Sequence, residues 1–330
     1  MSLQPTSRSL TSGLPLPSDE ARQLVAKGLS SPEHGMALCG FSGEVVEAIE
    51  REVGTVLDDP EALSKIEGLV TEALVAWATG EVPVRYVPDG EQTPNRVIFA
   101  FCVVMAPYAE QQLMARGIPE RVIETTLGST AHQVELHQRL HRTLGVESAW
   151  WQLYGLMGGW IAIGQLHAHR IVLGRHPLGP DPWISREQQD LHGPGWQSGD
   201  EAIGLHIPHG ADLSPSALNE TFREMASIVP LMWPSDATRL LTIQTWMLDR
   251  QLVPELDRTS KILSFQAAFT PTDAFAENDS LTKRLVFGTT PNPEQPTSLQ
   301  AALLHLWSQG GHSRWEVGVR TLNEGLRSAT

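Results

Sequence analysis

The residue best suited to acid–base chemistry is His206, which lies in the apolar stretch Gly204-Leu205-His206-Ile207. In a β-strand the side chains alternate between two faces, so His206 is expected to point away from Leu205 and Ile207. A neutral imidazole near pH 7 is the usual general base, and a carboxylate commonly orients it. Asp249 follows another expected strand and is the candidate carboxylate, either for the histidine or for a cationic amine. The alternatives are a hydrogen-bonded core histidine and a strand-end cap.

Two further histidines, His167 and His169, occupy alternate positions of an expected strand and therefore share a face. Such a pair can bind zinc, but no Cys, His or Asp follows at a recognisable ligand spacing. We expect the pair to act as bases or substrate ligands and expect no metal. A histidine-ligated, metal-dependent hydrolase is the less favoured alternative.

A third group of histidines, His132, His137 and His141, falls within one expected helix, and the last two are i, i+4 neighbours. Three arginines lie close by in sequence: Arg121, Arg139 and Arg142. This pattern is typical of a solvated helix face. It also fits a basic patch that an acidic carrier protein would bind.

The loop Gly210-Ala211-Asp212-Leu213-Ser214-Pro215-Ser216 joins an expected strand to an expected helix, a place where proteins often hold phosphate. Gly210 permits a tight turn, Ser214 is a favoured N-cap, and Pro215 suits the first helical position. However, Pro215 donates no hydrogen bond, Asp212 would repel a diphosphate, and no lysine lies in the loop. The loop predicts a capped helix start or, alternatively, a site for a single phosphate.

These residues require two different kinds of supporting structure. Residues 1–148 are expected to form a helical domain, with helices beginning near Ser18 and Pro60, an apolar helix over 97–116, and a helix over 131–144 capped by Thr130 and Gln133. Residues 149–330 are expected to form an α/β domain with a mixed sheet. Its elements are a hairpin over 150–174, strands at 202–208, 239–247, 282–288 and 313–321, and helices at 215–229, 254–268 and 297–309.

Composition narrows the possible partners and location. The chain has 330 residues, 41% of them hydrophobic, and a formal net charge of −14. This charge argues against binding to nucleic acid or to an anionic membrane. Cys39 and Cys102 are the only cysteines, so a reducing cytoplasm is expected. Cys102 lies in an apolar run and is expected to be inert, whereas a Cys–His nucleophile built on Cys39 stays an open alternative.

Several segments in order resemble bacterial proteins described as acyltransferase domain-containing, which pair a helical N-acyltransferase N-terminal domain with a GNAT-like C-terminal domain. The segments are RGIPERV (116–122), WWQLYGLMGGWIAIGQLHAHR (150–170), LHIPHGADLSPSAL (205–218), TWMLDRQLVPELDRTSKILSFQAAF (245–269) and LVFG (285–288). The resemblance covers most of residues 95–320. Two stretches depart from it: Ile243-Gln244-Thr245-Trp246 lacks the Cys-His pair common in relatives, and Gln165-Leu166-His167-Ala168 replaces Arg-Leu-Gln-Phe.

The resemblance implies transfer of an acyl group from a phosphopantetheine thioester to an amine. In that setting His206 would be the base, and Ser260 would protonate the leaving thiolate or only cap a turn. Substrate contacts are expected from five residues: His167, His169, Trp246, Gly210 and Ser214.

The poor fit of the loop to a diphosphate favours a carrier-protein donor over free acyl-CoA, because a carrier's arm has one phosphodiester. The expected function is amide formation on an amine such as an amino sugar, in natural-product (antibiotic) biosynthesis, with the thioester as co-substrate and no tightly bound cofactor. The leading alternative is a non-catalytic GNAT-like binding module.

Overall fold

The computed structural model describes residues 16–82, 94–173, 191–234, 240–288 and 293–322. The chain forms two compact units, Met1–Ile161 and Ala162–Thr330. We expected a boundary after residue 148, but α7 (Ala149–Leu156) groups with the first unit. The domain boundary after residue 148 stays a prediction.

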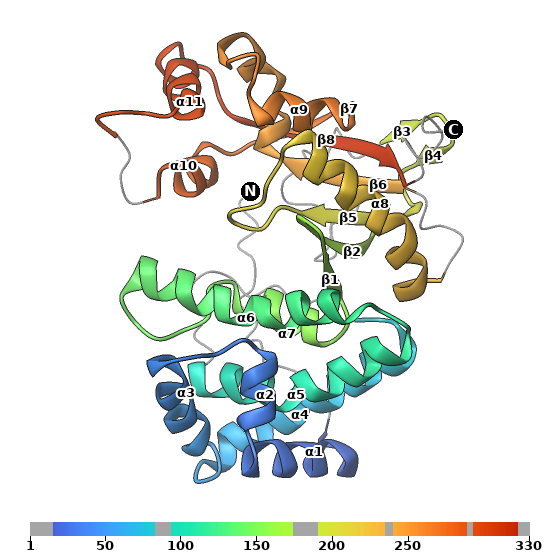
Figure 1. Cartoon of the computed structure of the whole chain (residues 1–330), viewed down its shortest axis with the longest axis vertical. Coiled ribbons are helices and arrows are strands. Elements are labelled where there is room, and N and C mark those ends of the chain that lie inside the picture. The colour runs from blue at the N-terminus through green and yellow to red at the C-terminus, as the bar shows by residue number, and fades with distance from the viewer. Residues whose placement is uncertain (1–15, 83–93, 174–190, 235–239, 289–292, 323–330) are drawn as a thin grey trace, which may run out of the picture. The chain divides into compact units, whose positions relative to one another are not determined.

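The described part of the first unit is helical, as the sequence predicts (Figure 1). Its helices before α7 are α1 (Asp19–Ser30), α2 (Glu33–Leu38), α3 (Glu44–Gly54), α4 (Pro60–Thr79), α5 (Asn95–Ala115) and α6 (Glu120–His141). Both expected helix starts near the N-terminus are confirmed. The Ser18 hydroxyl accepts a hydrogen bond from the Ala21 N–H. Asp59, which precedes Pro60, accepts from the N–H groups of the two residues that follow the proline. Side-chain caps of this kind stabilise a helix by about 1 kcal/mol.

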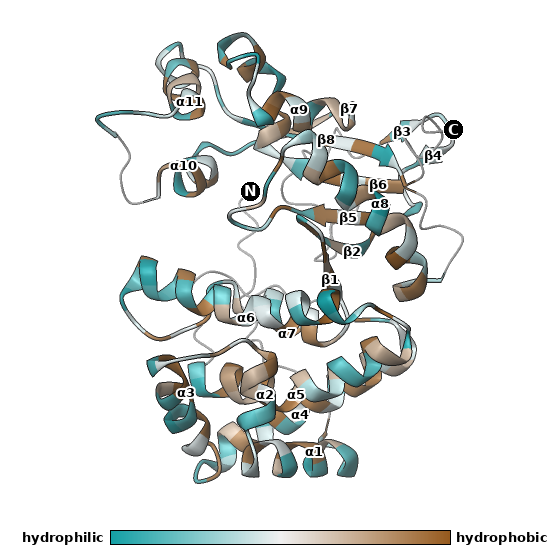
Figure 2. Ribbon diagram, in the orientation of Figure 1, coloured by the Kyte–Doolittle hydropathy of each residue, from teal (hydrophilic) through white to brown (hydrophobic). Residues whose placement is uncertain are grey.

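α5 is the central helix of this unit. It packs against every other helix of the unit, from α1 to α7. Figure 2 shows apolar and polar residues mixed on most of the surrounding helices, as expected of helices that bury one face. α5 is also long and apolar enough to cross a membrane, but 67% of its most apolar window is buried inside the protein. That burial is typical of a core helix.

The prediction that a helix over 131–144 begins at a capping box formed by Thr130 and Gln133 was wrong. α6 begins after Pro119, so Thr130 lies in the middle of a longer helix and is 1% exposed. Its hydroxyl donates to Gln152 Oε1 at 3.3 Å instead of capping. The hydroxyl that the Ser/Thr-x-x-Gln pattern assigns to a helix cap makes a tertiary contact instead, and the local sequence does not reveal that contact.

The start of the expected hairpin was also wrong, because residues 149–156 form α7 and not a strand. Aromatic packing explains the helix. The Trp151 ring stacks on Trp160 with a centroid distance of 5.5 Å, and Trp160 Nε1 donates to the Trp151 carbonyl at 2.6 Å. The hairpin itself is shorter: β1 (Trp160–Ile163) and β2 (Leu166–Val172).

The second unit contains a six-stranded sheet in the order β1-β2-β5-β6-β8-β7. The remaining strands are β5 (Glu201–His206), β6 (Leu240–Thr245), β7 (Thr270–Glu277) and β8 (Arg314–Thr321). β5 and β6 run parallel, whereas β2–β5, β6–β8 and β7–β8 are antiparallel, so the sheet is mixed as expected. A separate two-stranded pair consists of β3 (His192–Gly193) and β4 (Trp196–Gln197).

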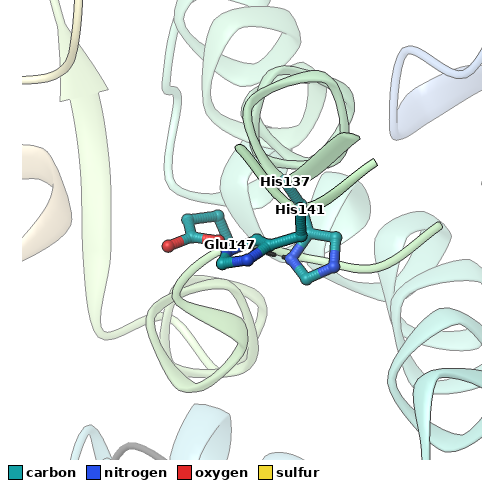
Figure 3. A group of neighbouring side chains, drawn as sticks. All are labelled: His137, His141 and Glu147. Carbon is teal, nitrogen blue, oxygen red and sulfur yellow. Dashed lines mark hydrogen bonds and ion pairs between the residues drawn. The ribbon is translucent and has the colours of Figure 1, made fainter. Parts of the chain in front are cut away.

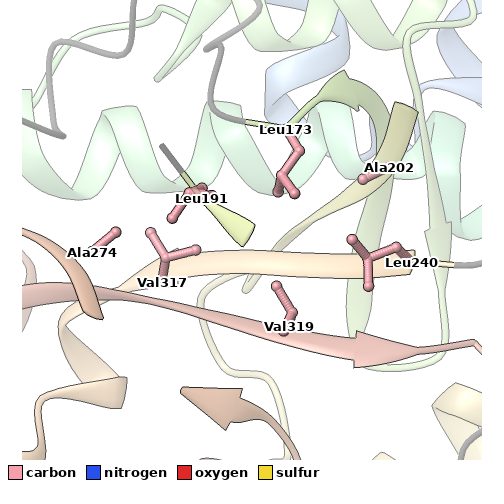
Figure 4. Packing of buried hydrophobic residues seen from close by; sticks show 7 residues of the cluster. All are labelled: Leu173, Leu191, Ala202, Leu240, Ala274, Val317 and Val319. Carbon is pink, nitrogen blue, oxygen red and sulfur yellow. The ribbon is translucent and has the colours of Figure 1, made fainter. Parts of the chain in front are cut away.

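The two faces of the sheet are covered differently. One face carries a buried cluster drawn in Figure 4: Leu173, Leu191, Ala202, Leu240, Ala274, Val317 and Val319. Arg320, the strand neighbour of Val319, points to the opposite face, and its guanidinium lies 4.4 Å from the Phe222 ring centroid. Phe222 belongs to α8 (Pro215–Met232) and packs edge-on against Phe269 beyond the end of α9 (Lys261–Ala267). α8 therefore covers the face opposite the cluster.

The expected strand at 282–288 was wrong, because these residues lie in α10 (Asp279–Phe287). Asn278 caps this helix by accepting from the Leu281 N–H at 3.0 Å. Phe287 packs with residues of α11 (Ser298–Ser308) and of the short helix η3 (Arg250–Glu255). The cap and the burial of the helix's apolar face outweigh the strand propensity of Leu285-Val286-Phe287.

Candidate active site

Three histidines lie on one face of the β2–β5 ribbon. His167 pairs with His206 across the two strands, and their rings have a centroid distance of 5.8 Å. His169 pairs with Gly204, two residues before His206, so all three side chains share a face. The sequence placed each histidine on a strand, and the register brings them together.

Gly204 makes room for His169. A Cβ atom at Gly204 would lie 2.6 Å from Cε1 and Nε2 of His169, closer than real Cβ contacts come. The imidazole therefore rests over the bare strand backbone. We did not single out Gly204 from the sequence, although a glycine inside a strand is a recognised sign of close approach by another group.

β5 and β6 separate at the end that carries His206. Their described pairs are Ile203–Leu241 and Gly204–Thr242, yet β5 continues to His206 and β6 to Thr245. The described ladder between β5 and β6 therefore ends at Gly204.

The surroundings of His206 favour a neutral imidazole. Burial lowers the pKa of His206 to about 4, while part of the side chain is exposed to solvent. Solvent contact moderates such a shift, but in either case the imidazole is neutral at pH 7. His167, by contrast, is 7% exposed, and His169 is half-buried. Of the three, His206 is the one a dissolved substrate reaches most readily.

A lysine from outside the loop reaches the segment from Gly210 to Ser216. Lys261, the first residue of α9, donates to Asp212 Oδ1 at 2.7 Å. The hydrogen bond from Lys261, together with those from Ser214, lowers the pKa of Asp212. No local pattern links Lys261 to this loop, and the contact follows from the packing of α9 against α8.

Gly210 and Ser214 shape the loop. Gly210 has a φ of +83°, which L-residues adopt only with strain, so the turn requires glycine. The Ser214 hydroxyl donates to Asp212 Oδ2 at 3.0 Å and makes no hydrogen bond that caps α8. Ser214 is the N-cap residue by position, but our interpretation of its side chain as the cap was wrong in this detail.

The structure does not bring Asp249 to a site histidine. Asp249 is fully buried, and its oxygens accept from the Gln251 N–H, the Gln251 side chain and the Arg314 N–H. Burial raises its pKa, and these hydrogen bonds oppose that effect. These contacts make Asp249 the N-cap of η3, and not the cap of a strand end that we held as the alternative. Trp246, which begins η2 (Trp246–Leu248), is 5% exposed and packs in the core.

Ser260 also has a structural role. It is the N-cap of α9, and its hydroxyl accepts from the Ile262 N–H at 3.3 Å. This is the second of the two roles that we had left open. Donation of its proton to a leaving thiolate is not tested by this contact and stays a prediction.

Covalent catalysis by cysteine is disfavoured. Cys39 and Cys102 are free and buried. Burial raises the pKa of Cys39 to about 12 despite a hydrogen bond with Thr130. The nucleophilic form of cysteine is the thiolate, which is scarcely populated at neutral pH for such a thiol.

The chain matches two family models, in the expected order. The N-acyltransferase N-terminal domain matches residues 33–156, and the GNAT-like C-terminal domain matches residues 162–320. A search of curated proteins gave no match.

Solved structures of acyltransferases share the fold. The crystal structure of an acyltransferase in complex with decanoyl-CoA has a TM-score of 0.68 and 22% identity, and the match covers 93% of this chain and 89% of that one. Two others, one in complex with decanoyl-CoA and teicoplanin and one with CoA and 10C-teicoplanin, have TM-scores of 0.61 and 22% identity over 95% of this chain and 91% of theirs. The family matches and this shared fold identify the chain as an acyltransferase that joins an N-acyltransferase N-terminal domain to a GNAT-like C-terminal domain.

Proposed function

We propose that the protein moves an acyl group from the phosphopantetheine thioester of an acyl-CoA to an amine, such as the amino group of an amino sugar in a natural product. The observation that carries this proposal is His206, a neutral and solvent-accessible imidazole at the end of β5, where that strand leaves β6. Both free cysteines are in keeping with the reducing cytoplasm, where acyl-CoA is found.

In the proposed reaction the amine nitrogen attacks the thioester carbonyl carbon, and His206 accepts the proton that the nitrogen loses. The resulting tetrahedral intermediate collapses with cleavage of the carbon–sulfur bond. The thiolate then takes up a proton from the imidazolium of His206, which restores the neutral base. The products are an amide and a free thiol, and no covalent enzyme intermediate is required.

The donor is better described as acyl-CoA than our sequence analysis allowed. The objection to a diphosphate at this loop was the negative charge of Asp212, and Lys261 offsets that charge. With the charge of Asp212 offset, the N-terminus of α8 supplies the positive potential beside the loop. Structures with the same fold contain decanoyl-CoA. A carrier-protein thioester, the donor favoured by sequence alone, is the competing possibility.

The acceptor is proposed to lie along the β2 histidines. His167 and His169 share the face of His206, and an imidazole can donate to or accept from the hydroxyl groups that surround the amine of an amino sugar. A structure with the same fold contains teicoplanin together with decanoyl-CoA. The chemical class we propose is therefore a polar, hydroxyl-rich amine.

The test is an assay of thiol release with a series of acyl-CoA chain lengths and a panel of amino sugars, with mass spectrometry of the amide. We expect His206→Ala to lower kcat by about 10²- to 10⁴-fold, the usual contribution of a general base. His305→Ala, which removes an exposed histidine of α11, should leave kcat unchanged. Near-normal turnover of a folded His206→Ala protein would overturn the proposal.

A second measurement separates the two donors. Lys261→Ala should raise KM for acyl-CoA and have a smaller effect on kcat, because without the lysine the uncompensated charge of Asp212 repels the donor phosphates, whereas the lysine takes no part in proton transfer. The same acyl group should then be offered on a carrier protein. Faster turnover from the carrier by wild-type protein would replace acyl-CoA as the donor while keeping the acyl transfer itself.

A further inference from the structure

The C-terminal end of α6 brings two imidazoles and a carboxylate together (Figure 3). His137 and His141 are one helical turn apart, and both face the same oxygen of Glu147. That oxygen, Oε2, lies 3.3 Å from His137 Nδ1 and 3.0 Å from His141 Nε2. All three potential ligand atoms lie within 4.8 Å of one another. Among the residues that the structure describes, this is the group of three His, Cys, Asp or Glu side chains that lie close enough together to hold a metal ion.

The spacing matches the edges of a metal coordination shell. Ligand atoms that are each about 2.0–2.1 Å from zinc at tetrahedral angles lie about 3.3 Å from one another. The separations from Glu147 Oε2 to the two imidazole nitrogens are close to this value. The third edge, between the two imidazole nitrogens, is within 4.8 Å, so rotation of the histidine side chains would close the group around an ion.

Thr143 provides the outer contact that a metal-bound histidine usually has. His137 Nε2, the nitrogen not directed at Glu147, lies 3.3 Å from Thr143 Oγ1. If Nε2 carries the proton and donates it to this hydroxyl, Nδ1 presents its lone pair toward His141 and Glu147. Outer partners of this kind fix the tautomer and orientation of metal-binding histidines.

The loop that carries Glu147 is held in place by its own backbone. Arg142 and Ser148 have positive φ values of 60° and 52°, which are unfavourable for residues other than glycine. Between them, Gly145 packs so tightly on His137 that a Cβ atom would lie 2.4 Å from Nε2. The Glu147 N–H donates to the Gln133 carbonyl at 3.1 Å, which ties the loop back to α6. Glu147 is thus positioned before any ligand arrives.

From this arrangement we propose that His137, His141 and Glu147 bind a divalent transition-metal ion of the zinc type. Two imidazole nitrogens and one carboxylate oxygen suit Zn²⁺, Co²⁺, Ni²⁺ or Cu²⁺, whereas Mg²⁺ and Ca²⁺ prefer oxygen ligands alone. A water molecule would complete the shell. The ion would join the end of α6 to the loop before α7 and stabilise the first unit. The solvated helix face and the basic patch, which the sequence left open for these histidines, stay predictions.

The experiment uses full-length protein without a polyhistidine tag, treated with chelator and dialysed. Calorimetric titration with Zn²⁺ should show one saturable site, and Co²⁺ should give the visible absorption typical of low-coordinate, nitrogen-ligated cobalt. His141→Ala and Glu147→Gln should each abolish this binding. Thr143→Val, which removes only the outer contact, should raise the Kd for Zn²⁺ by about tenfold. Zn²⁺ should also raise the Tm of wild-type protein.

The matched control is His312→Ala, because His312 is an exposed histidine that faces a carboxylate at 2.8 Å but is not in a three-ligand group. This variant should bind Zn²⁺ as wild type does. His141 is half exposed, so its replacement should leave the far-ultraviolet circular dichroism unchanged. Wild-type protein without a saturable Zn²⁺ site, or folded His141→Ala and Glu147→Gln variants with unaltered Kd, would overturn the proposal.

Discussion

Among single residues, Gly204 connects the strand register to the candidate site. Because its missing side chain is the space that His169 fills, Gly204→Ala should push the imidazole away from the strand. We expect a loss of about 1–3 kcal/mol in the free energy of unfolding, typical of overpacking, together with weaker binding of the acceptor.

Thermal unfolding and KM for the acceptor would measure these two effects. Gly128→Ala is a suitable comparison, because nothing lies within 4 Å of a Cβ atom at that helical position and its φ is not positive. That variant should be as stable as wild type or slightly more so. An unchanged Tm and KM in Gly204→Ala would mean that His169 can move away without cost.

The protonation of His206 gives a prediction about pH. The pKa of His206 in the folded protein is lowered to about 4, whereas an unfolded histidine has a pKa of about 6.5. Between these two values the unfolded chain binds more protons, so stability should fall as the pH is lowered from about 6.5 to 4 and should be fully retained above 6.5. Acid unfolding of wild type beside His206→Gln isolates this contribution.

An NMR titration of the His206 ring provides the direct measurement, with His206→Gln used to assign the signal. A midpoint well below that of an ordinary histidine is expected. If the ring titrates near pH 6.5, and if the wild type and His206→Gln lose stability in parallel on acidification, then the surroundings of the imidazole are more polar than we infer.

At the level of secondary-structure elements, Asp279 joins α10, α11 and the start of β8. Its carboxylate accepts hydrogen bonds from Trp307 Nε1, the Ser313 N–H and the Ser313 hydroxyl, and its Oδ2 lies 2.8 Å from His312 Nδ1. Burial alone would raise the pKa of Asp279, but these hydrogen bonds, led by that of His312, lower it to about 2. A single side chain thus holds together three elements that are distant in sequence.

Asp279→Ala should therefore lower the free energy of unfolding by about 1.5–3 kcal/mol, the range for hydrogen bonds to a charged group. Because the folded pKa is depressed, this contribution should be present above pH 4 and lost as the pH falls toward 2. Urea unfolding at pH 7 and pH 3 would measure both. Asp257→Ala, which removes an exposed carboxylate bonded only within its own turn, should cost less. Equal losses in the two variants would contradict the role of Asp279.

For the molecule as a whole, the open question is where the first domain ends. The Trp77 indole donates to the Leu156 carbonyl at 2.9 Å, and Trp151 stacks on Trp160. Both contacts involve residues after 148 that belong to the first unit. A fragment of residues 1–161 should therefore unfold at a higher temperature than a fragment of residues 1–148, because only the longer one covers α5 with α7.

Circular dichroism during heating would compare the two fragments, with the intact chain as reference. A fragment of residues 1–148 that unfolds at the same temperature as the longer one would support the boundary expected from sequence and would show that α7 adds nothing to the first core.

The sequence by itself determined the features that depend on neighbouring residues. The helix starts near Ser18 and Pro60, the turn at Gly210, and the division into a helical part and a part with a mixed sheet all follow from local patterns and were predicted correctly. The strand positions of His167 and His206 were also available, because alternation along a strand has a period of two residues.

Only the tertiary structure decided which of these residues meet. The register that sets His167 beside His206 links residues 39 positions apart in the sequence, and register is determined by turn geometry and packing that no short pattern contains. For the same reason Lys261 was missed as the partner of Asp212, and Asp249 was assigned to a histidine that it does not contact. Residues 282–288 became a helix because an asparagine cap and a buried face outweighed intrinsic strand propensity, which is a weak preference compared with burial.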